Sequence, residues 1–330
     1  MRRLVVGGVV LSLLVLTAAA LRADVKTQEK SLVRFEGGLG RMMSMFGGKA
    51  AKEGIVSTVA LKGNRKLTLS DYGGQLIDLA EEKIYDINVR DKSYTAMTFE
   101  QYRRKLEEAQ KQAKQDMKEA EKAQKPEAGE TKEVEVDFDL KETGQRKSIA
   151  GYETREVIMT ITVREKGKTL EDGGGMVMTS DMWMADPIPA LAEIQQFDRT
   201  YFEKLAGPLA AGMDAQQMAM ASALYPMMKD AMARMQKEGA RLKGTALAST
   251  TKFEGVKSKA EMSQASSGGQ EAGGGGIGGM LARKLMKKKP EDQSARATIF
   301  TTDHEVQSIA TSVPDTDVAI PAGYRDKTKR

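Results

Sequence analysis

Short strand patterns follow one another between residues 55 and 98, and turn residues close each of them at once. The turns are Gly63-Asn64, Asp71 to Gly74, Ala80 to Glu82 and Asp91-Lys92, all of residue types that end strands. Parallel neighbours need a crossover of a dozen or more residues, and none of these connections is that long. The spacing therefore predicts an antiparallel meander.

Alternation within the meander assigns side chains to faces. Tyr85, Ile87 and Val89 share one face of their strand, and Tyr94 and Ala96 are candidate neighbours on the next strand. Whether this face looks inward or outward depends on the pairing register, which the sequence leaves open.

Strict alternation over residues 133–141 (EVEVDFDLK) predicts a strand with one buried and one wet face. Val136 and Phe138 lie on the apolar face, and acids occupy the positions between. The pattern continues through residues 152–168, where Met159 and Ile161 fall on one face, and through a strand within residues 173–184. A further strand is expected at Thr245 to Phe253.

Three segments have helical periodicity. Apolar residues at three- and four-residue steps predict a helix over residues 99–124, and further stripes run from Ile188 to Leu205 and from Met218 to Met235. The stripe from Ile188 begins within the sequence DPIP (residues 186–189), which suits the start of a helix.

Glycine and charge divide the chain into segments. Residues 24–257 are expected to form the main part of one domain, and residues 258–290 a Gly-rich flexible tract. Residues 291–330 are expected to complete the same domain as a C-terminal hairpin, with strands at Arg296 to Thr302 and Val306 to Thr311 that turn at Asp303-His304.

The N-terminus has the pattern of a signal peptide over residues 1–23. Two arginines precede an apolar stretch, and small residues provide cleavage sites near Ala20 or Ala23. We expect the mature chain to be periplasmic or secreted; an uncleaved membrane anchor is the alternative. Losing Arg2, Arg3 and Arg22 lowers the net charge from +5 to +2, so nucleic acid is not an expected partner.

Cysteine is absent and His304 is the only histidine. Without cysteine the chain can form neither disulfides nor thiolate sites, and we interpret His304 as a turn residue. We therefore expect no catalytic residue, no metal site and no cofactor, and we expect that the protein is not an enzyme. Carboxylate chemistry remains open, because paired acids can assemble across distance in sequence.

The Gly-rich tract ends in a basic segment, IGGMLARKLMKKK, over residues 277–289. As a helix it would place apolar residues on one side and cations around the other, which suits the surface of an anionic membrane. A docked or unstructured segment is the alternative. The candidate membrane-surface residues are Met280, Leu281, Arg283, Lys284, Lys287 and Lys288.

The order of a signal peptide, a meander containing LIDLAEEKIYDINVRDKSYTAM, a helix, the phrase MTSDMWMADPIPALAEI and a terminal VAIPAGYR resembles secreted bacterial domains of unknown function with a lipoprotein-carrier (LolA/LolB-like) fold. The resemblance implies an α+β fold, in which a curved antiparallel sheet forms an unclosed barrel covered by helices. Here flexible insertions would be added to it. It also implies an apolar hollow that holds lipid or acyl chains.

Methionine is abundant, with 21 residues, and its flexible side chain suits either a variable apolar cavity or gap filling in a core. We therefore expect an exported binding protein that holds an apolar or lipidic ligand between sheet and helices. The alternative is an envelope interaction protein with a filled hollow, acting through exposed helices or the basic segment. The candidate ligand-lining residues are Val136, Phe138, Met159, Ile161, Met178, Trp183 and Met228.

Overall fold

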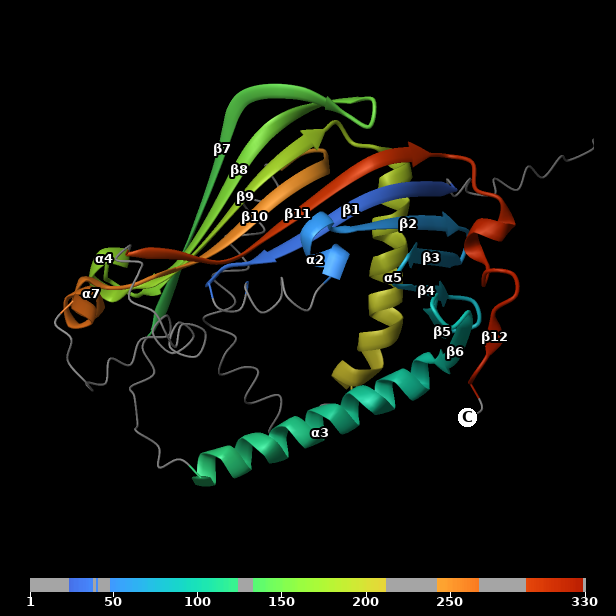
Figure 1. Ribbon diagram of the computed structural model, residues 1–330, viewed down its shortest axis with the longest axis horizontal. Coiled ribbons are helices and arrows are strands. Elements are labelled where there is room, and N and C mark those ends of the chain that lie inside the picture. The colour runs from blue at the N-terminus through green and yellow to red at the C-terminus, as the bar shows by residue number, and fades with distance from the viewer. Residues whose placement is uncertain are drawn as a thin grey trace, which may run out of the picture.

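The computed structural model describes residues 24–37, 40, 48–123, 133–211, 242–266 and 295–328. Their strands form one sheet in the order β12-β6-β5-β4-β3-β2-β1-β11-β10-β9-β8-β7 (Figure 1). The strands are β1 (Val25–Phe35), β2 (Ile55–Lys62), β3 (Arg65–Ser70), β4 (Gly73–Asp78), β5 (Lys83–Asn88), β6 (Ser93–Thr98), β7 (Val134–Ile149), β8 (Tyr152–Glu165), β9 (Gly175–Ala185), β10 (Thr245–Val256), β11 (Arg296–Ala310) and β12 (Arg325–Asp326).

The α+β class and the open antiparallel sheet predicted from the sequence are confirmed. Within the described residues β12 and β7 end the sheet, and only the short β12–β6 pair is parallel. Strands β2 to β6 pair in chain order, as expected of a meander. The helices are α2 (Gly48–Glu53), α3 (Phe99–Ala123), α4 (Leu170–Gly173), α5 (Pro189–Ala211) and α7 (Lys259–Ser266), with a 3-10 turn, η1, at Asp315–Val318.

The prediction of a C-terminal hairpin is wrong, because β11 is one continuous strand. It lies between β1 and β10 and pairs with both along most of its length. Polar residues that resemble a turn in sequence contact side chains of these neighbours. Asp303 Oδ2 lies 2.6 Å from Arg34 Nη1, and Asp303 Oδ1 accepts a 2.9 Å hydrogen bond from Thr250.

A core forms where α5 lies against one face of the sheet, which we call the inner face (Figure 1). Val25 and Leu61 of the sheet are buried in the same cluster as Leu191 and Phe197 of α5. α3 joins this core through Phe99, whose ring centroid lies 5.4 Å from that of Tyr201 on α5. Other core members are Ile77, Leu79, Ile84, Ile149, Ala185, Ile188, Ala190, Leu247 and Val306.

The opposite, outer face of the meander is covered by the C-terminal segment. Tyr85 pairs with Ala96 and Ile87 with Tyr94, which confirms that these side chains share a face. Leu67, Leu76 and Ile87 form a cluster with Tyr85, Tyr94, Ile320 and Tyr324, and Ala60 packs with Val313 and Val318. Tyr85, Ile87 and Tyr94 therefore face away from α5.

Candidate functional site

Six apolar side chains from six adjacent strands form a line across the sheet. The register pairs Phe138 with Ile161, Ile161 with Met178, and Met178 with Phe253. Phe253 in turn pairs with Phe300, and Phe300 with Phe35. We call these six residues the apolar row. Its five intervals of about 4.8 Å give a length of about 24 Å.

The apolar row lies on the inner face, the face that also carries α5. Phe35 and Val25 are ten positions apart on β1, and alternation therefore directs both to the same side. β1 pairs with β2 without a register shift from Val25 to Ser31. Because Val25 belongs to the core under α5, the row continues the inner face beyond that core.

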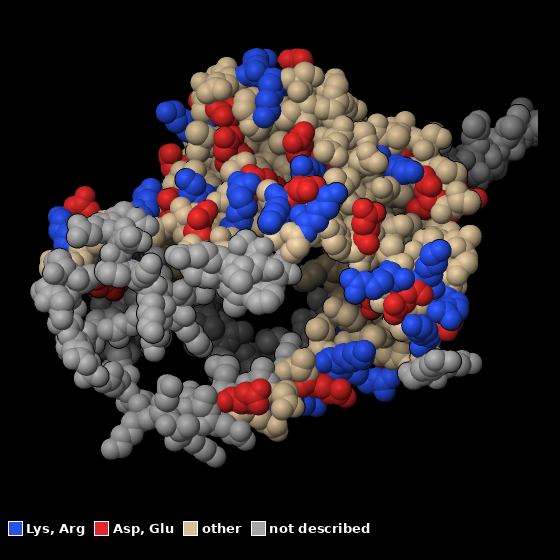
Figure 2. Space-filling model, in the orientation of Figure 1, with Lys and Arg blue, Asp and Glu red and all other residues tan. Residues whose placement is uncertain are grey.

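The aromatic members of the row pack against one another, and the row remains partly exposed. The rings of Phe253 and Phe300 stack with centroids 4.3 Å apart, and those of Phe300 and Phe35 are tilted at 5.9 Å. All six side chains are neither fully buried nor fully exposed, and none is a member of the core cluster that α5 forms with the sheet. Figure 2 shows an opening in the surface between the strands and the first part of α3.

Five of the predicted ligand-lining residues fall on this face. Phe138, Ile161 and Met178 are members of the row, and Met159 lies two positions from Ile161 on the same side of β8. Val136 lies beside Phe138 on β7, opposite Val163. The sequence analysis missed Phe35, Phe253 and Phe300. The pairing of Phe35 with Phe300 joins segments more than 200 residues apart, and that of Phe253 with Phe300 joins strands on either side of the Gly-rich tract.

Trp183 lies on the other face of β9, since it is an odd number of positions from Met178. Lys147 Nζ lies 3.8 Å from the centre of its ring, and its ring packs at the margin of the α5 core. Nearby, Thr143 donates a 2.5 Å hydrogen bond to Glu156, and burial together with the charge of Glu156 raises the pKa of Asp181. Trp183 therefore packs beside the α5 core and is not a member of the apolar row.

The remaining site candidates lie outside the described residues. One of these is Met228, within the predicted helix from Met218 to Met235. The others are the membrane-surface residues Met280, Leu281, Arg283, Lys284, Lys287 and Lys288. The predicted signal peptide at residues 1–23 also lies outside the described residues.

Hydroxyl side chains follow the apolar row along the same face. Ser180, Thr251 and Thr302 occupy paired positions two residues from Met178, Phe253 and Phe300, and Ser180 Oγ lies 2.5 Å from Thr251 Oγ1. On β9, β10 and β11 the inner face thus changes from apolar to hydroxyl-lined within one step of about 6.6 Å along the strands.

One step further, His304 of β11 forms an ion pair with Glu29 of β1. Its Nε2 lies 3.1 Å from Glu29 Oε2, and Thr27 donates a 2.7 Å hydrogen bond to Glu29 Oε1. The hydrogen bond to Glu29 raises the pKa of His304 above 6.5, although burial acts in the other direction. Burial raises the pKa of Glu29, but the hydrogen bonds from His304 and Thr27 outweigh it and leave that pKa below 4.5.

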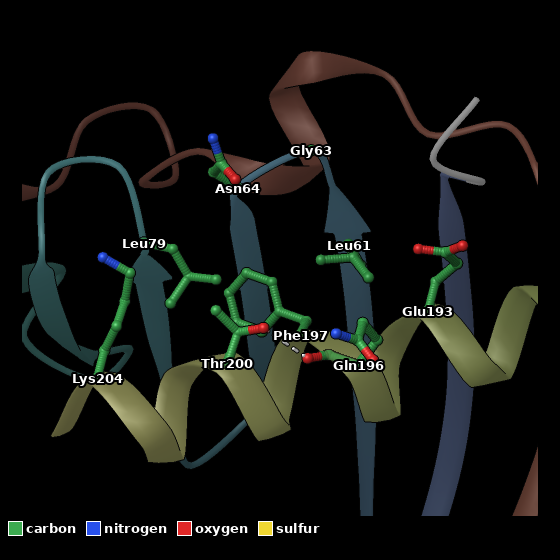
Figure 3. A pocket seen from close by; sticks show the side chains of 9 residues that line it. All are labelled: Leu61, Gly63, Asn64, Leu79, Glu193, Gln196, Phe197, Thr200 and Lys204. Atoms are coloured by element: carbon green, nitrogen blue, oxygen red, sulfur yellow. Dashed lines mark hydrogen bonds between the residues drawn. The ribbon is translucent and has the colours of Figure 1, made fainter. Parts of the chain in front are cut away.

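A notch of about 270 Å³ lies between α5 and the β2–β3 and β4–β5 turns (Figure 3). Leu61, Leu79 and Phe197 supply its apolar surface, and Glu193 and Lys204 stand among the polar residues at its edge. Its volume is below the roughly 300 to 1,000 Å³ of ordinary small-molecule sites, and its apolar lining belongs to the core. The notch is therefore a weaker candidate than the apolar row.

The structure offers little else that would indicate chemistry. In the described ranges no group of three or more Asp, Glu or His side chains is placed to hold a metal ion. No helix within those ranges has the length and hydropathy needed to cross a membrane.

Comparisons with protein-family models, with curated proteins and with solved structures found no match to this chain.

Proposed function

We propose that this protein is an exported, non-enzymatic binding protein that holds an apolar or lipidic ligand on the inner face of its sheet. The observation that carries the proposal is the apolar row, in which six strands place partly open apolar side chains in one line. A line about 24 Å long matches an extended long acyl chain better than a compact ligand.

The architecture we propose is the unclosed barrel of the lipoprotein-carrier fold, with the ligand between the sheet and the helices α3 and α5. The packing of α5 against the inner face, and of Phe99 at the start of α3 against Tyr201 of α5, supports this arrangement. Cleavage after residue 20 or 23 would deliver the mature chain to the periplasm or the cell exterior.

Burial of methylene groups would supply the binding energy, at about 0.8 kcal/mol for each one. Apolar contacts have no directional preference, so chains of similar length should bind with similar affinity.

The test compares two substitutions at neighbouring positions of β9 that point to opposite faces. Met178→Gln places an amide in the apolar row, and Thr179→Gln, its matched control, places the same group on the other face. We expect Met178→Gln to weaken binding of a fluorescent fatty acid by about tenfold, since it removes roughly 1.4 kcal/mol of apolar contact. Thr179→Gln should bind like the unmodified protein.

Native mass spectrometry of the mature chain, purified without detergent, provides a second readout. A co-purified lipid or acylated molecule would support the proposal. A protein that carries no lipid and takes up no fatty acid would overturn it, and would leave an interaction protein with a filled hollow as the alternative.

A further inference from the structure

The inner face has a polar end as well as an apolar one. His304 follows Phe300 by four residues on β11, about 13 Å along the strand and on the same side. Its direct cross-strand neighbours are Ser31 of β1 and Ser249 of β10. Hydrogen-bond donors therefore surround His304 on both adjacent strands.

One ring nitrogen of His304 remains available. Nε2 is engaged by Glu29, whereas none of the contacts among the described residues uses Nδ1. The His304 side chain is 40% exposed and that of Glu29 24%. In the imidazolium form both ring nitrogens carry a proton, so Nδ1–H can donate to a ligand without disturbing the pair with Glu29.

We propose that His304, Ser31 and Ser249 receive the oxyanion head of an amphiphile, a carboxylate, sulfate or phosphate, whose chain lies along the apolar row. This inference rests on the proposed function and adds the chemistry of the head group. An oxyanion can accept a hydrogen bond from each of these side chains. An amine head would meet the like charge of the imidazolium, and both oxygens of Glu29 already accept hydrogen bonds.

The charges near His304 make this recognition depend on pH. Glu29 on β1 faces the imidazole of His304 directly, and the neighbour on β10, Ser249, is uncharged. The positive charge of Lys66 on β3 helps to lower the pKa of Glu29. Lys66 is itself paired with Asp198 of α5. The imidazolium is therefore the group that changes charge near neutral pH, and affinity for an acidic amphiphile should fall as pH rises through the pKa of His304.

The experiment compares two ligands with the same chain, hexadecyl sulfate and hexadecanol, by displacement of a bound fluorescent fatty acid. The sulfate is permanently ionised, so only the protein titrates. At about pH 5.5, where the imidazole is charged, we expect the sulfate to bind at least about tenfold more tightly than the alcohol, as a charge-assisted hydrogen bond implies. At about pH 8.5 this preference should shrink.

His304→Gln keeps a hydrogen-bond donor but removes the charge, and should abolish the preference while still binding hexadecanol. Glu305→Gln alters the next, exposed position, which alternation directs to the other face, and should leave the preference unchanged. Equal binding of the two ligands by the unmodified protein, or a preference that survives His304→Gln, would overturn the head-group assignment and leave the apolar site intact. Binding of neither ligand would overturn the proposed function, and the head-group assignment with it.

Inorganic phosphate in excess separates an amphiphile head from a free anion. If the preference for hexadecyl sulfate persists in phosphate, the site recognises the head together with its chain. If phosphate alone removes the preference, the site binds a free oxyanion and the amphiphile assignment is wrong.

Discussion

Two pKa shifts with opposite directions define the pH range over which Glu29 and His304 stabilise the fold. The pKa of Glu29 lies below 4.5 in the folded protein, so its contribution is present above pH 4.5 and is lost as pH falls through the folded value. The pKa of His304 lies above 6.5, so its contribution is complete below pH 6.5 and is lost as pH rises through the folded value. Both contributions are present together between pH 4.5 and 6.5.

Glu29→Gln should therefore lower the free energy of unfolding most within that range. Because both side chains are partly exposed, we expect a loss of no more than about 1 kcal/mol. The loss should be smaller at about pH 8.5, because the imidazolium gives up its proton as pH rises through its pKa. Urea unfolding at the two pH values measures the difference. A loss that is equal at both values would show that the charge on His304 does not contribute.

The same residues show where inference from sequence alone stops. Asp303, His304 and Glu305 resemble a turn by composition, yet they lie within a strand because β1 and β10 supply Arg34, Glu29 and Thr250 as partners. Trp183 is a different case. It lies five positions from Met178, so alternation within β9 places the two residues on opposite sides. Partners distant in sequence decide the first case, whereas local alternation decides the second.

At the scale of elements, α5 anchors the inner face through Phe197, which is 5% exposed beside Leu61 and Leu79. Phe197→Ala should cost about 3 to 5 kcal/mol, because the deletion removes a buried ring and leaves a cavity. Phe202 on the same helix is 68% exposed, and Phe202→Ala should change stability by less than about 0.5 kcal/mol. The midpoints of urea unfolding compare the two variants directly. Equal losses would mean that α5 contributes through helix formation rather than through packing.

Helices and strands with strong periodicity could be predicted from sequence, whereas their partners could not. The stripe from Phe99 predicts α3, and DPIP marks the start of α5 at Pro189. Alternation in residues 133–141 predicts β7, although the strand continues to Ile149. Nothing local indicates that β1 pairs with β11, since the two segments are separated by more than 250 residues. The apolar row depends on that pairing, so only part of it could be inferred.

At the scale of the molecule, β11 joins the two halves of the sheet. On one side β1 to β6 follow in chain order, and on the other β10 to β7 follow in reverse order. The strand that closes the gap between β1 and β10 comes from the last quarter of the chain. Residues 313–324 then cover the outer face of the meander. Both contributions require nearly the full chain, and such distant pairing is expected to make folding slow.

A chain that ends at Val256 should therefore fail to unfold cooperatively. It would leave β1 and β10 with unpaired edges, which favours aggregation, and would expose the cluster of Leu67, Leu76 and Ile87 to water. Ending the chain at Tyr324 instead removes β12, a pairing of two residues, and should retain a cooperative transition. Thermal unfolding followed by circular dichroism distinguishes the two chains. A separate peptide of residues 295–328 should restore a cooperative thermal transition to the chain that ends at Val256, because it adds the missing strand β11. If the chain that ends at Val256 unfolds cooperatively by itself, the two halves of the sheet are joined without β11.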